Sequence, residues 1–130
     1  MSLHSDDDVV LVRLAVREWM IEQAYSLLKQ TKMITATSEL ARNAITHGGG
    51  GGGGGEAHLE RINKGEQDGI RVTVADQGLG IANLEQALQG GFSSDGGLGL
   101  GLSGSKKLVD EFDICSELGK GTRVTITLWK

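Results

Sequence analysis

Apolar side chains recur at spacings of three and four residues in two stretches near the start of the chain. The first stretch, from about Ser5 to Tyr25, carries them at Val9, Val12, Val16, Trp19 and Met20. The second, from about Leu28 to His47, carries an inward stripe at Met33, Thr37, Leu40, Ala41, Ala44 and Ile45. This spacing predicts two helices, each with one buried face. Ser5 and the three aspartates after it are typical of a helix start, where a hydroxyl caps the chain and carboxylates match the positive helix end.

Further along the chain the pattern changes to alternation, which is typical of half-buried strands. The segment Ile70–Ala75 alternates apolar and polar residues and ends at Asp76. Thr122–Trp129 alternates in the same way near the end of the chain. Ala57–Asn63 and Phe112–Leu118 are weaker candidates for strands.

Turns and short helices are predicted between these strands. A turn over Lys64–Gly69 ends in Asp68-Gly69, a dipeptide that favours hairpins. The segment Ile81–Gln89 has the pattern of a short helix. A further helix is expected to be capped by Ser103 or Ser105. Leu108 and Val109 of this helix, and Phe112 at the start of the next strand, are predicted to point inward.

Two helices followed by strands and short helices predict a single domain over residues 1–130. The expected fold class is α+β, a two-layer sandwich with helices on one face of a mostly antiparallel mixed sheet. Residues 1–5 are expected to be a tag or disordered, with Met1-Ser2-Leu3 left outside the fold as a cloning scar. The glycine run of residues 48–55 is predicted to be a mobile loop, because it has no side chains to bury.

Composition narrows the functional classes. The chain has 17 acidic and 13 basic side chains, and its net charge of −4 argues against a nucleic-acid partner, which favours a basic face. A single cysteine, Cys115, excludes an internal disulfide and is expected to be a small core residue. No apolar stretch has the length of a membrane span, so no membrane partner and a cytoplasmic location are expected.

Two glycine clusters follow the carboxylate of Asp76. The first is Gly78-Leu79-Gly80, and the second runs from Gly96 to Gly101 after a Gly-Phe-Ser-Ser-Asp segment. Glycine lets the backbone turn tightly and approach a ligand closely, because it has no Cβ. Amide groups in such turns, or at the start of a helix, attract phosphate. The stretch Asp76–Leu102 is therefore predicted to hold a nucleotide.

Two common phosphate-binding motifs fit these glycines poorly. Gly99–Gly104 matches the dinucleotide pattern G-x-G-x-x-G, but a loop rich in glycine and serine precedes it where a strand is required. Gly119-Lys120 resembles the end of a Walker loop, but no serine or threonine follows directly. The dinucleotide fold is therefore disfavoured and the Walker loop is excluded.

Four separated motifs together resemble a different nucleotide-binding family. They are Ser38–Asn43 on a helix, Asp76-x-Gly78-x-Gly80 after a strand, Gly97-x-Gly99-x-Gly101 before a helix, and Gly121-Thr122 in the last strand. In this order they resemble the N box, the two glycine boxes and the final Gly-Thr of the GHKL ATP-binding family of gyrase, Hsp90, histidine kinases and MutL. The string Ser-Glu-Leu-Ala-Arg-Asn, the short lid and the small size look like the RsbT-type kinases of bacterial stress signalling.

The resemblance implies how the base of ATP is bound. Asp76 accepts a hydrogen bond from the adenine amino group, as a carboxylate is a pure acceptor. Gly78 and Gly80 let the backbone pass against the ring. Thr122 supports the adenine beside them.

The resemblance also implies how the triphosphate is held. Asn43 binds Mg²⁺ through its side-chain oxygen, and Glu39, one helical turn earlier, acts as general base toward a serine hydroxyl. Ser93 closes over the γ-phosphate as part of a lid. The phosphates are wrapped by the segment Gly97, Leu98, Gly99, Leu100, Gly101 and Leu102.

The activity that this family implies is an ATP-dependent serine/threonine kinase. Its substrate is a small STAS-domain antagonist protein, and its further partner is a PP2C-type phosphatase. Two alternatives stay open: an RsbW-type anti-sigma factor that binds a sigma subunit and also phosphorylates its antagonist, and a detached ATP-binding domain of a histidine kinase. A nucleotide-binding pseudokinase fits the same residues. The chain departs from the family pattern in its long glycine run and in Leu79, where proline is common.

Overall fold

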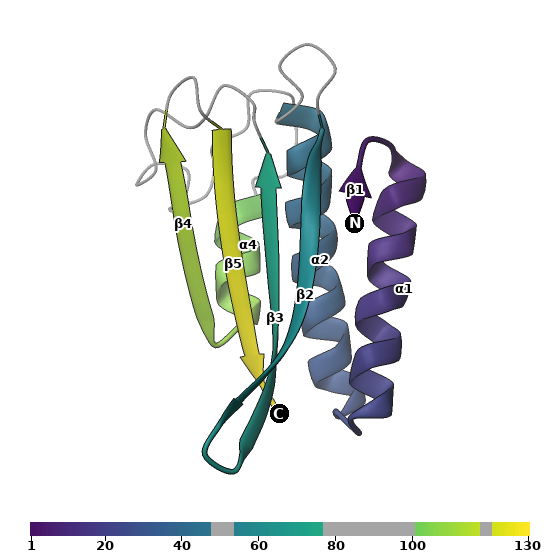
Figure 1. The fold of residues 1–130 in the computed structure, drawn as a ribbon, viewed down its shortest axis with the longest axis vertical. Coiled ribbons are helices and arrows are strands. Elements are labelled where there is room, and N and C mark those ends of the chain that lie inside the picture. The colour runs from purple at the N-terminus through teal and green to yellow at the C-terminus, as the bar shows by residue number, and fades with distance from the viewer. Residues whose placement is uncertain (48–53, 77–100, 118–120) are drawn as a thin grey trace.

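The computed structural model describes residues 1–47, 54–76, 101–117 and 121–130, in which helices cover one face of a five-stranded sheet (Figure 1). The helices are α1 (Asp6–Glu22), α2 (Leu27–His47) and α4 (Gly101–Leu108). The strands are β1 (Ser2–Leu3), β2 (Gly55–Lys64), β3 (Gln67–Asp76), β4 (Glu111–Glu117) and β5 (Gly121–Trp129). The predicted α+β sandwich is confirmed. The sheet order is β1-β2-β3-β5-β4 and all pairings among the described strands are antiparallel, so the described sheet is not mixed.

Both predicted N-terminal helices are present. Helix α1 begins after Ser5, whose backbone N–H lies 3.3 Å from Oδ2 of Asp8, and it buries Val9, Val12, Val16 and Met20. It ends at Glu22 instead of about Tyr25, because Ala24 takes a positive φ of 59° that a helix does not allow. Helix α2 differs from its predicted range by one residue at the start. Its predicted stripe is buried, with Ile45 only partly so.

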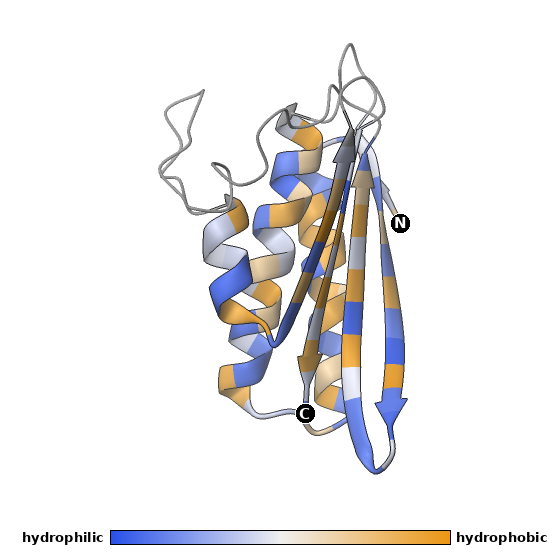
Figure 2. Ribbon diagram, turned by 90° about the vertical axis from the view of Figure 1, so that its left-hand side faces the viewer, coloured by the Kyte–Doolittle hydropathy of each residue, from blue (hydrophilic) through white to orange (hydrophobic). Residues whose placement is uncertain are grey.

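The core lies between the helices and the inward face of the sheet. Inward side chains pair across β3 and β5 at Ile70–Leu128, Val72–Ile126 and Val74–Val124. Figure 2 shows the resulting bands of hydrophobic and hydrophilic residues along the strands. These pairs account for the alternation seen in the sequence, because successive side chains of a strand point to opposite faces. None of the described helices is both long and apolar enough to cross a membrane.

The hairpin between β2 and β3 turns earlier than predicted. Lys64 pairs with Gln67, so the turn is Gly65-Glu66, where Gly65 has a φ of +66°. Asp68 and Gly69 belong to β3. A Cβ on Gly69 would come 2.7 Å from Cε3 of Trp129, so this glycine is needed for close packing and not for a turn.

The first residues are part of the fold, so the expectation of a tag outside it was wrong. The amino group of Met1 donates to the carbonyl of Ala57 at 2.8 Å, and Leu3 pairs with Gly55. The Leu3 side chain is fully buried. The predicted glycine loop is also too long at its end, since Gly55 begins β2. A Cβ on Gly55 would collide with the carbonyl of Ala75, which explains a glycine there.

Truncating Leu3 tests whether the N-terminal strand stabilises the domain. Leu3→Ala is expected to lower the free energy of unfolding by about 2 kcal/mol, because it removes a fully buried side chain. Leu27→Ala is the matched control, since Leu27 is 77% exposed. Urea unfolding should show a change within about 0.5 kcal/mol for the control. Equal stability of the two variants would contradict the burial of Leu3.

Two further local predictions were wrong. Cys115 is exposed, because the inward side chains of β4 are Phe112 and Ile114 and the residue between Ile114 and Ser116 points outward. Helix α4 begins at Gly101 and contains both serines that were expected to cap it. The predicted inward direction of Leu108, Val109 and Phe112 is confirmed, because all three are partly buried against the core. The predicted helix of residues 81–89 and the predicted lid that includes Ser93 lie outside the described residues.

Candidate functional site

A row of polar side chains crosses three strands at the end of the sheet. Thr122 pairs with Asp76 on one side and with Ser116 on the other. Two residues earlier on β3, the corresponding row is Val74–Val124–Ile114, which is apolar and faces the helices. Because side chains two residues apart share a face, the row Asp76–Thr122–Ser116 also faces the helices. Polar groups therefore replace the core at this end of the sandwich.

Hydrogen bonds hold this row in place. The backbone N–H of Thr122 donates to Oδ1 of Asp76 at 3.3 Å. The hydroxyls of Ser116 and Thr122 lie 2.9 Å apart, and Ser116 also donates to the carbonyl of Gly121 at 3.2 Å. All three side chains of the row are half-buried. The Asp76 carboxylate is thus fixed at the end of β3 by the main chain of β5.

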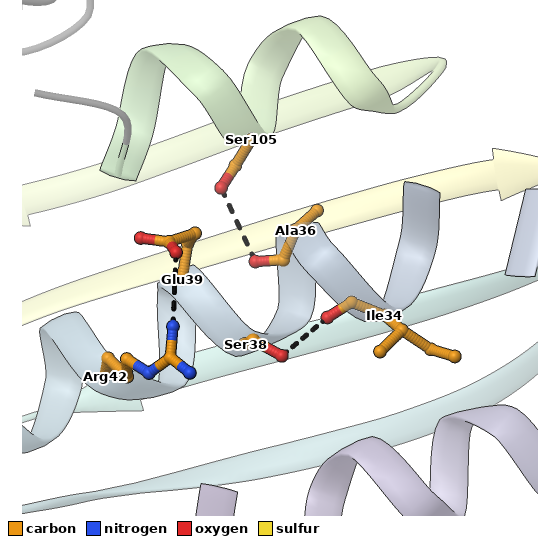
Figure 3. Close-up of polar contacts among 6 residues, drawn as sticks. All are labelled: Ile34, Ala36, Ser38, Glu39, Arg42 and Ser105. Atoms are coloured by element: carbon orange, nitrogen blue, oxygen red, sulfur yellow. Dashed lines mark hydrogen bonds and ion pairs between the residues drawn. The ribbon is translucent and has the colours of Figure 1, made fainter. Parts of the chain in front are cut away.

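Helix α2 carries the two predicted residues Glu39 and Asn43, one turn apart and both half-buried. Oε1 of Glu39 lies 3.3 Å from Nη1 of Arg42. Figure 3 draws this ion pair. The side chain of Arg42 is 52% exposed, so this ion pair is screened by water and holds Glu39 only weakly. The Glu39 carboxylate can therefore exchange Arg42 for another hydrogen-bond donor at little cost.

Helix α4 packs against α2 on the side of Glu39. The fully buried Ser105 reaches the carbonyl of Ala36 at 3.4 Å, and Glu39 lies one turn further along α2 (Figure 3). The two helices run in opposite directions (Figure 1). Gly101, one turn before Ser105, therefore lies level with the part of α2 between Glu39 and Asn43. The start of a helix is its positive end, which favours anions such as phosphate.

The same end of the molecule brings α2 close to the polar row. Gly55 is the register partner of Asp76, and a Cβ on it would come 3.4 Å from Cβ of Ala44, the residue after Asn43. The last turns of α2 therefore pack on the ends of β2 and β3. With the starts of β5 and α4, they gather at one end of the sandwich (Figure 1).

Six of the predicted site residues are described by the structure, all on elements that meet at this end: Glu39, Asn43, Asp76, Gly101, Leu102 and Thr122. Leu102 is half-buried against the core. The other seven lie outside the described residues: Gly78, Gly80, Ser93, Gly97, Leu98, Gly99 and Leu100. Among the described residues, no group of three or more His, Cys, Asp or Glu side chains could hold a metal ion.

Sequence reasoning missed the contacts that two serines make in this region. Ser105 joins α4 to α2, and Ser116 joins β4 to Thr122. For Ser116 a signal was available. It follows Phe112 and Ile114 at intervals of two, so it is a polar residue at an inward position of a predicted strand.

Comparisons with known proteins agree with this arrangement. Residues 28–130 match the family described as histidine kinase-, DNA gyrase B-, and HSP90-like ATPase. The chain is 38% identical over 122 residues to serine/threonine-protein kinase RsbT of Bacillus subtilis (strain 168), covering 94% of this chain and 89% of that protein. It is 29% identical over 124 residues to an anti-sigma F factor of Clostridium beijerinckii, covering 92% and 85%.

A solved structure has the same fold. It contains the RsbU and RsbW domains of Rv1364c from Mycobacterium tuberculosis and superposes with a TM-score of 0.69 at 23% identity. The match covers 100% of this chain and 32% of that one. At this level of identity the likeness concerns the fold alone.

Proposed function

Because the chain belongs to the histidine kinase-, DNA gyrase B- and HSP90-like ATPase family, we propose that it is an ATP-dependent serine/threonine kinase. Its proposed substrate is a small STAS-domain antagonist protein in a partner-switching pathway of the cytoplasm. The similarity to RsbT supports a serine/threonine kinase over the other activities of the family. The observation that carries it is the position of Glu39, one turn before Asn43 and beside the start of α4.

The polar row is the proposed site of the adenine. The Asp76 carboxylate is half-buried and already ordered by the N–H of Thr122. It can accept a hydrogen bond from an exocyclic amino group, whereas the carbonyl oxygen of a 6-oxopurine would face it with a second acceptor. The site therefore favours adenine over guanine.

Asn43 is the proposed protein ligand of Mg²⁺. Its amide oxygen is the hard ligand that this ion accepts, and Mg²⁺ commonly takes one or two protein ligands together with phosphates and water. When bound, the ion would neutralise the charge of the phosphates. The positive start of α4 lies level with the part of α2 between Glu39 and Asn43 and would add to that neutralisation.

Glu39 is the proposed general base. In the transfer, the serine oxygen of the substrate forms a bond to the γ-phosphorus, and the bond from that phosphorus to the β–γ bridging oxygen breaks. The proton of the serine hydroxyl passes to the Glu39 carboxylate, and ADP leaves. Since phosphoryl transfer depends mainly on alignment and charge neutralisation, a weak base suffices. Exchange of Arg42 for the hydroxyl needs little energy, because that ion pair is exposed.

The proposed activity is tested by incubating the protein with Mg-ATP and purified STAS-domain proteins. Mass spectrometry is expected to find one added phosphate on a serine or threonine of the substrate, with an equal yield of ADP. Reactions without Mg²⁺, or with ADP in place of ATP, are the controls. ATP binding without transfer to any STAS protein would contradict the kinase and favour a nucleotide-bound regulator.

The magnesium ligand is tested separately by Asn43→Ala. Mg²⁺ should raise the ATP affinity of the native chain about tenfold. Asn43→Ala is expected to lose most of this gain, because the ion loses its protein ligand. Calorimetry with and without Mg²⁺ measures that gain. Asn63→Ala is the control, since Asn63 lies in the distant hairpin and bonds to Asp68. If the gain from Mg²⁺ survives in Asn43→Ala, the metal is held elsewhere.

A second candidate function comes from the similarity to an anti-sigma F factor. In that case the chain would bind a sigma subunit in addition to phosphorylating its antagonist. A pull-down with a sigma factor and with a PP2C-type phosphatase separates the two. Capture of the phosphatase alone supports the RsbT-type reading, and capture of the sigma factor supports the anti-sigma reading.

A further inference from the structure

Strand β4 carries a serine at a position where its sequence pattern demands an apolar side chain. The inward residues before Ser116 are Phe112 and Ile114, which pack on the core. Ser116 continues the same face and is half-buried. A half-buried hydroxyl costs free energy unless it is hydrogen-bonded, so its contacts indicate why it is there.

The Ser116 hydroxyl makes hydrogen bonds to the first two residues of β5. It donates to the carbonyl of Gly121 at 3.2 Å and lies 2.9 Å from Oγ1 of Thr122. Gly121 has a φ of +97°, a conformation that fixes how the chain enters the strand. Ser116 therefore restrains both the main chain at Gly121 and the side chain at Thr122.

The contact with Thr122 also restrains the direction of that hydroxyl. A hydroxyl has one hydrogen and two lone pairs, so when Ser116 donates to Gly121 it accepts from Thr122. Without this contact, the Thr122 side chain could adopt several staggered rotamers, which direct Oγ1 toward different neighbours. The pairing selects the rotamer in which Oγ1 lies toward β4, while the Thr122 N–H stays on Asp76.

We propose that Ser116 is a positioning residue for the purine base, acting through Thr122. This rests on the proposed function, in which Asp76 and Thr122 bind the adenine. Ser116 reaches the base site from β4 and bonds to the first two residues of β5, whereas α2 and α4 are proposed to face the phosphates. Its loss should weaken nucleotide binding without slowing transfer from bound ATP.

A purely structural role for Ser116, holding the end of β4 against the start of β5, makes a different prediction. It would lower stability, and it would weaken ATP binding whether or not Thr122 has a hydroxyl. A double-mutant cycle separates the two roles, since it isolates the coupling between Ser116 and Thr122.

The experiment measures the Kd for Mg-ATP by calorimetry, with melting temperature in parallel, for Ser116→Ala, Thr122→Val and the double variant. Ser116→Ala is expected to raise the Kd for Mg-ATP about fivefold, as the loss of one hydrogen bond does. The kcat should be unchanged and the KM for ATP raised. The double variant should bind no more weakly than Thr122→Val. Ser116→Thr keeps the hydroxyl and should restore affinity to within about twofold.

The matched control breaks a hydroxyl pair of the same kind on the opposite face. Thr73 and Thr125 have their Oγ1 atoms 3.3 Å apart on β3 and β5, away from the site. Thr125→Val should leave the Kd for ATP unchanged. If Ser116→Ala does not fold, Ser116→Cys makes the same test, because a thiol fills the space but bonds weakly.

The outcomes separate this inference from the proposed function. If the native chain does not bind ATP, both fail. If it binds ATP but Ser116→Ala weakens binding equally with and without the Thr122 hydroxyl, or has no effect, only the role of Ser116 is overturned. A fivefold loss that disappears in the Thr122→Val background establishes it.

Discussion

Replacing Glu39 with glutamine is expected to lower kcat for transfer to the substrate protein by about 10²- to 10⁴-fold, the usual contribution of a general base. The affinity for ATP should stay within about twofold, because Glu39 is placed to meet the substrate hydroxyl and not the nucleotide. The amide keeps the size of the side chain and removes only its ability to take a proton. Loss of the exposed pair with Arg42 should change stability little.

Single-turnover transfer at saturating Mg-ATP measures this effect, with calorimetry for ATP binding. Glu66→Gln is the control, since Glu66 lies in the exposed turn of the β2–β3 hairpin and undergoes the same chemical change. Transfer by the Glu39 variant at the native rate would show that another group takes the proton, or that alignment alone is enough.

Replacing Asp76 with asparagine is expected to weaken ATP binding by about 10- to 100-fold. The variant exchanges a charged acceptor for an amide, and hydrogen bonds to charged groups are worth about 1.5–3 kcal/mol. The N–H of Thr122 keeps an acceptor in the amide oxygen, which then turns the NH₂ group toward the adenine amino group. The fold should survive, because the backbone of residue 76 still pairs with Gly55 on β2 and with Thr122 on β5.

Calorimetry with ATP and with GTP measures this second effect. Asp113→Asn is the matched control, because Asp113 is an exposed carboxylate on β4 that pairs with Thr125 on the outer face. The Asp76 variant should lose its preference for ATP over GTP, and the control should keep it. Unchanged ATP affinity in Asp76→Asn would remove the adenine site from this end of the sheet.

The helices and central strands could be predicted from the sequence because one face of each is buried. The apolar stripe of α2 and the alternation of β3 and β5 result directly from that burial. The bounds of these three elements were therefore predicted to within one to three residues. The Leu3 strand could not be found in this way. A strand of two residues has no period, and its formation depends on the unpaired edge of β2.

The remaining errors have a similar cause. Whether Cys115 points in or out depends on where Phe112 and Ile114 begin the alternation, and a shift of one residue reverses every side chain. The turn at Gly65 was missed because Asp68-Gly69 carries a stronger local signal. Only the packing of Trp129 on Gly69 explains why that glycine is not in the turn.

The candidate site was predicted by the order of its motifs and not by local pattern. Taken alone, Glu39 and Asn43 indicate only a polar stripe on a helix, and Asp76 indicates only the end of a strand. Their meeting depends on the packing of α2 against the sheet at Ala44 and Gly55, which no periodicity reports. Ser116 was missed because its partner Thr122 lies across a strand pair whose register the sequence does not specify.

The most direct test of the ATP site is a crystal structure of this chain with Mg²⁺ and a non-hydrolysable ATP analogue. We expect the adenine amino group within hydrogen-bond distance of the Asp76 carboxylate and the metal within coordination distance of the Asn43 side-chain oxygen. A nucleotide bound with its base or its metal away from these two side chains would contradict this expectation.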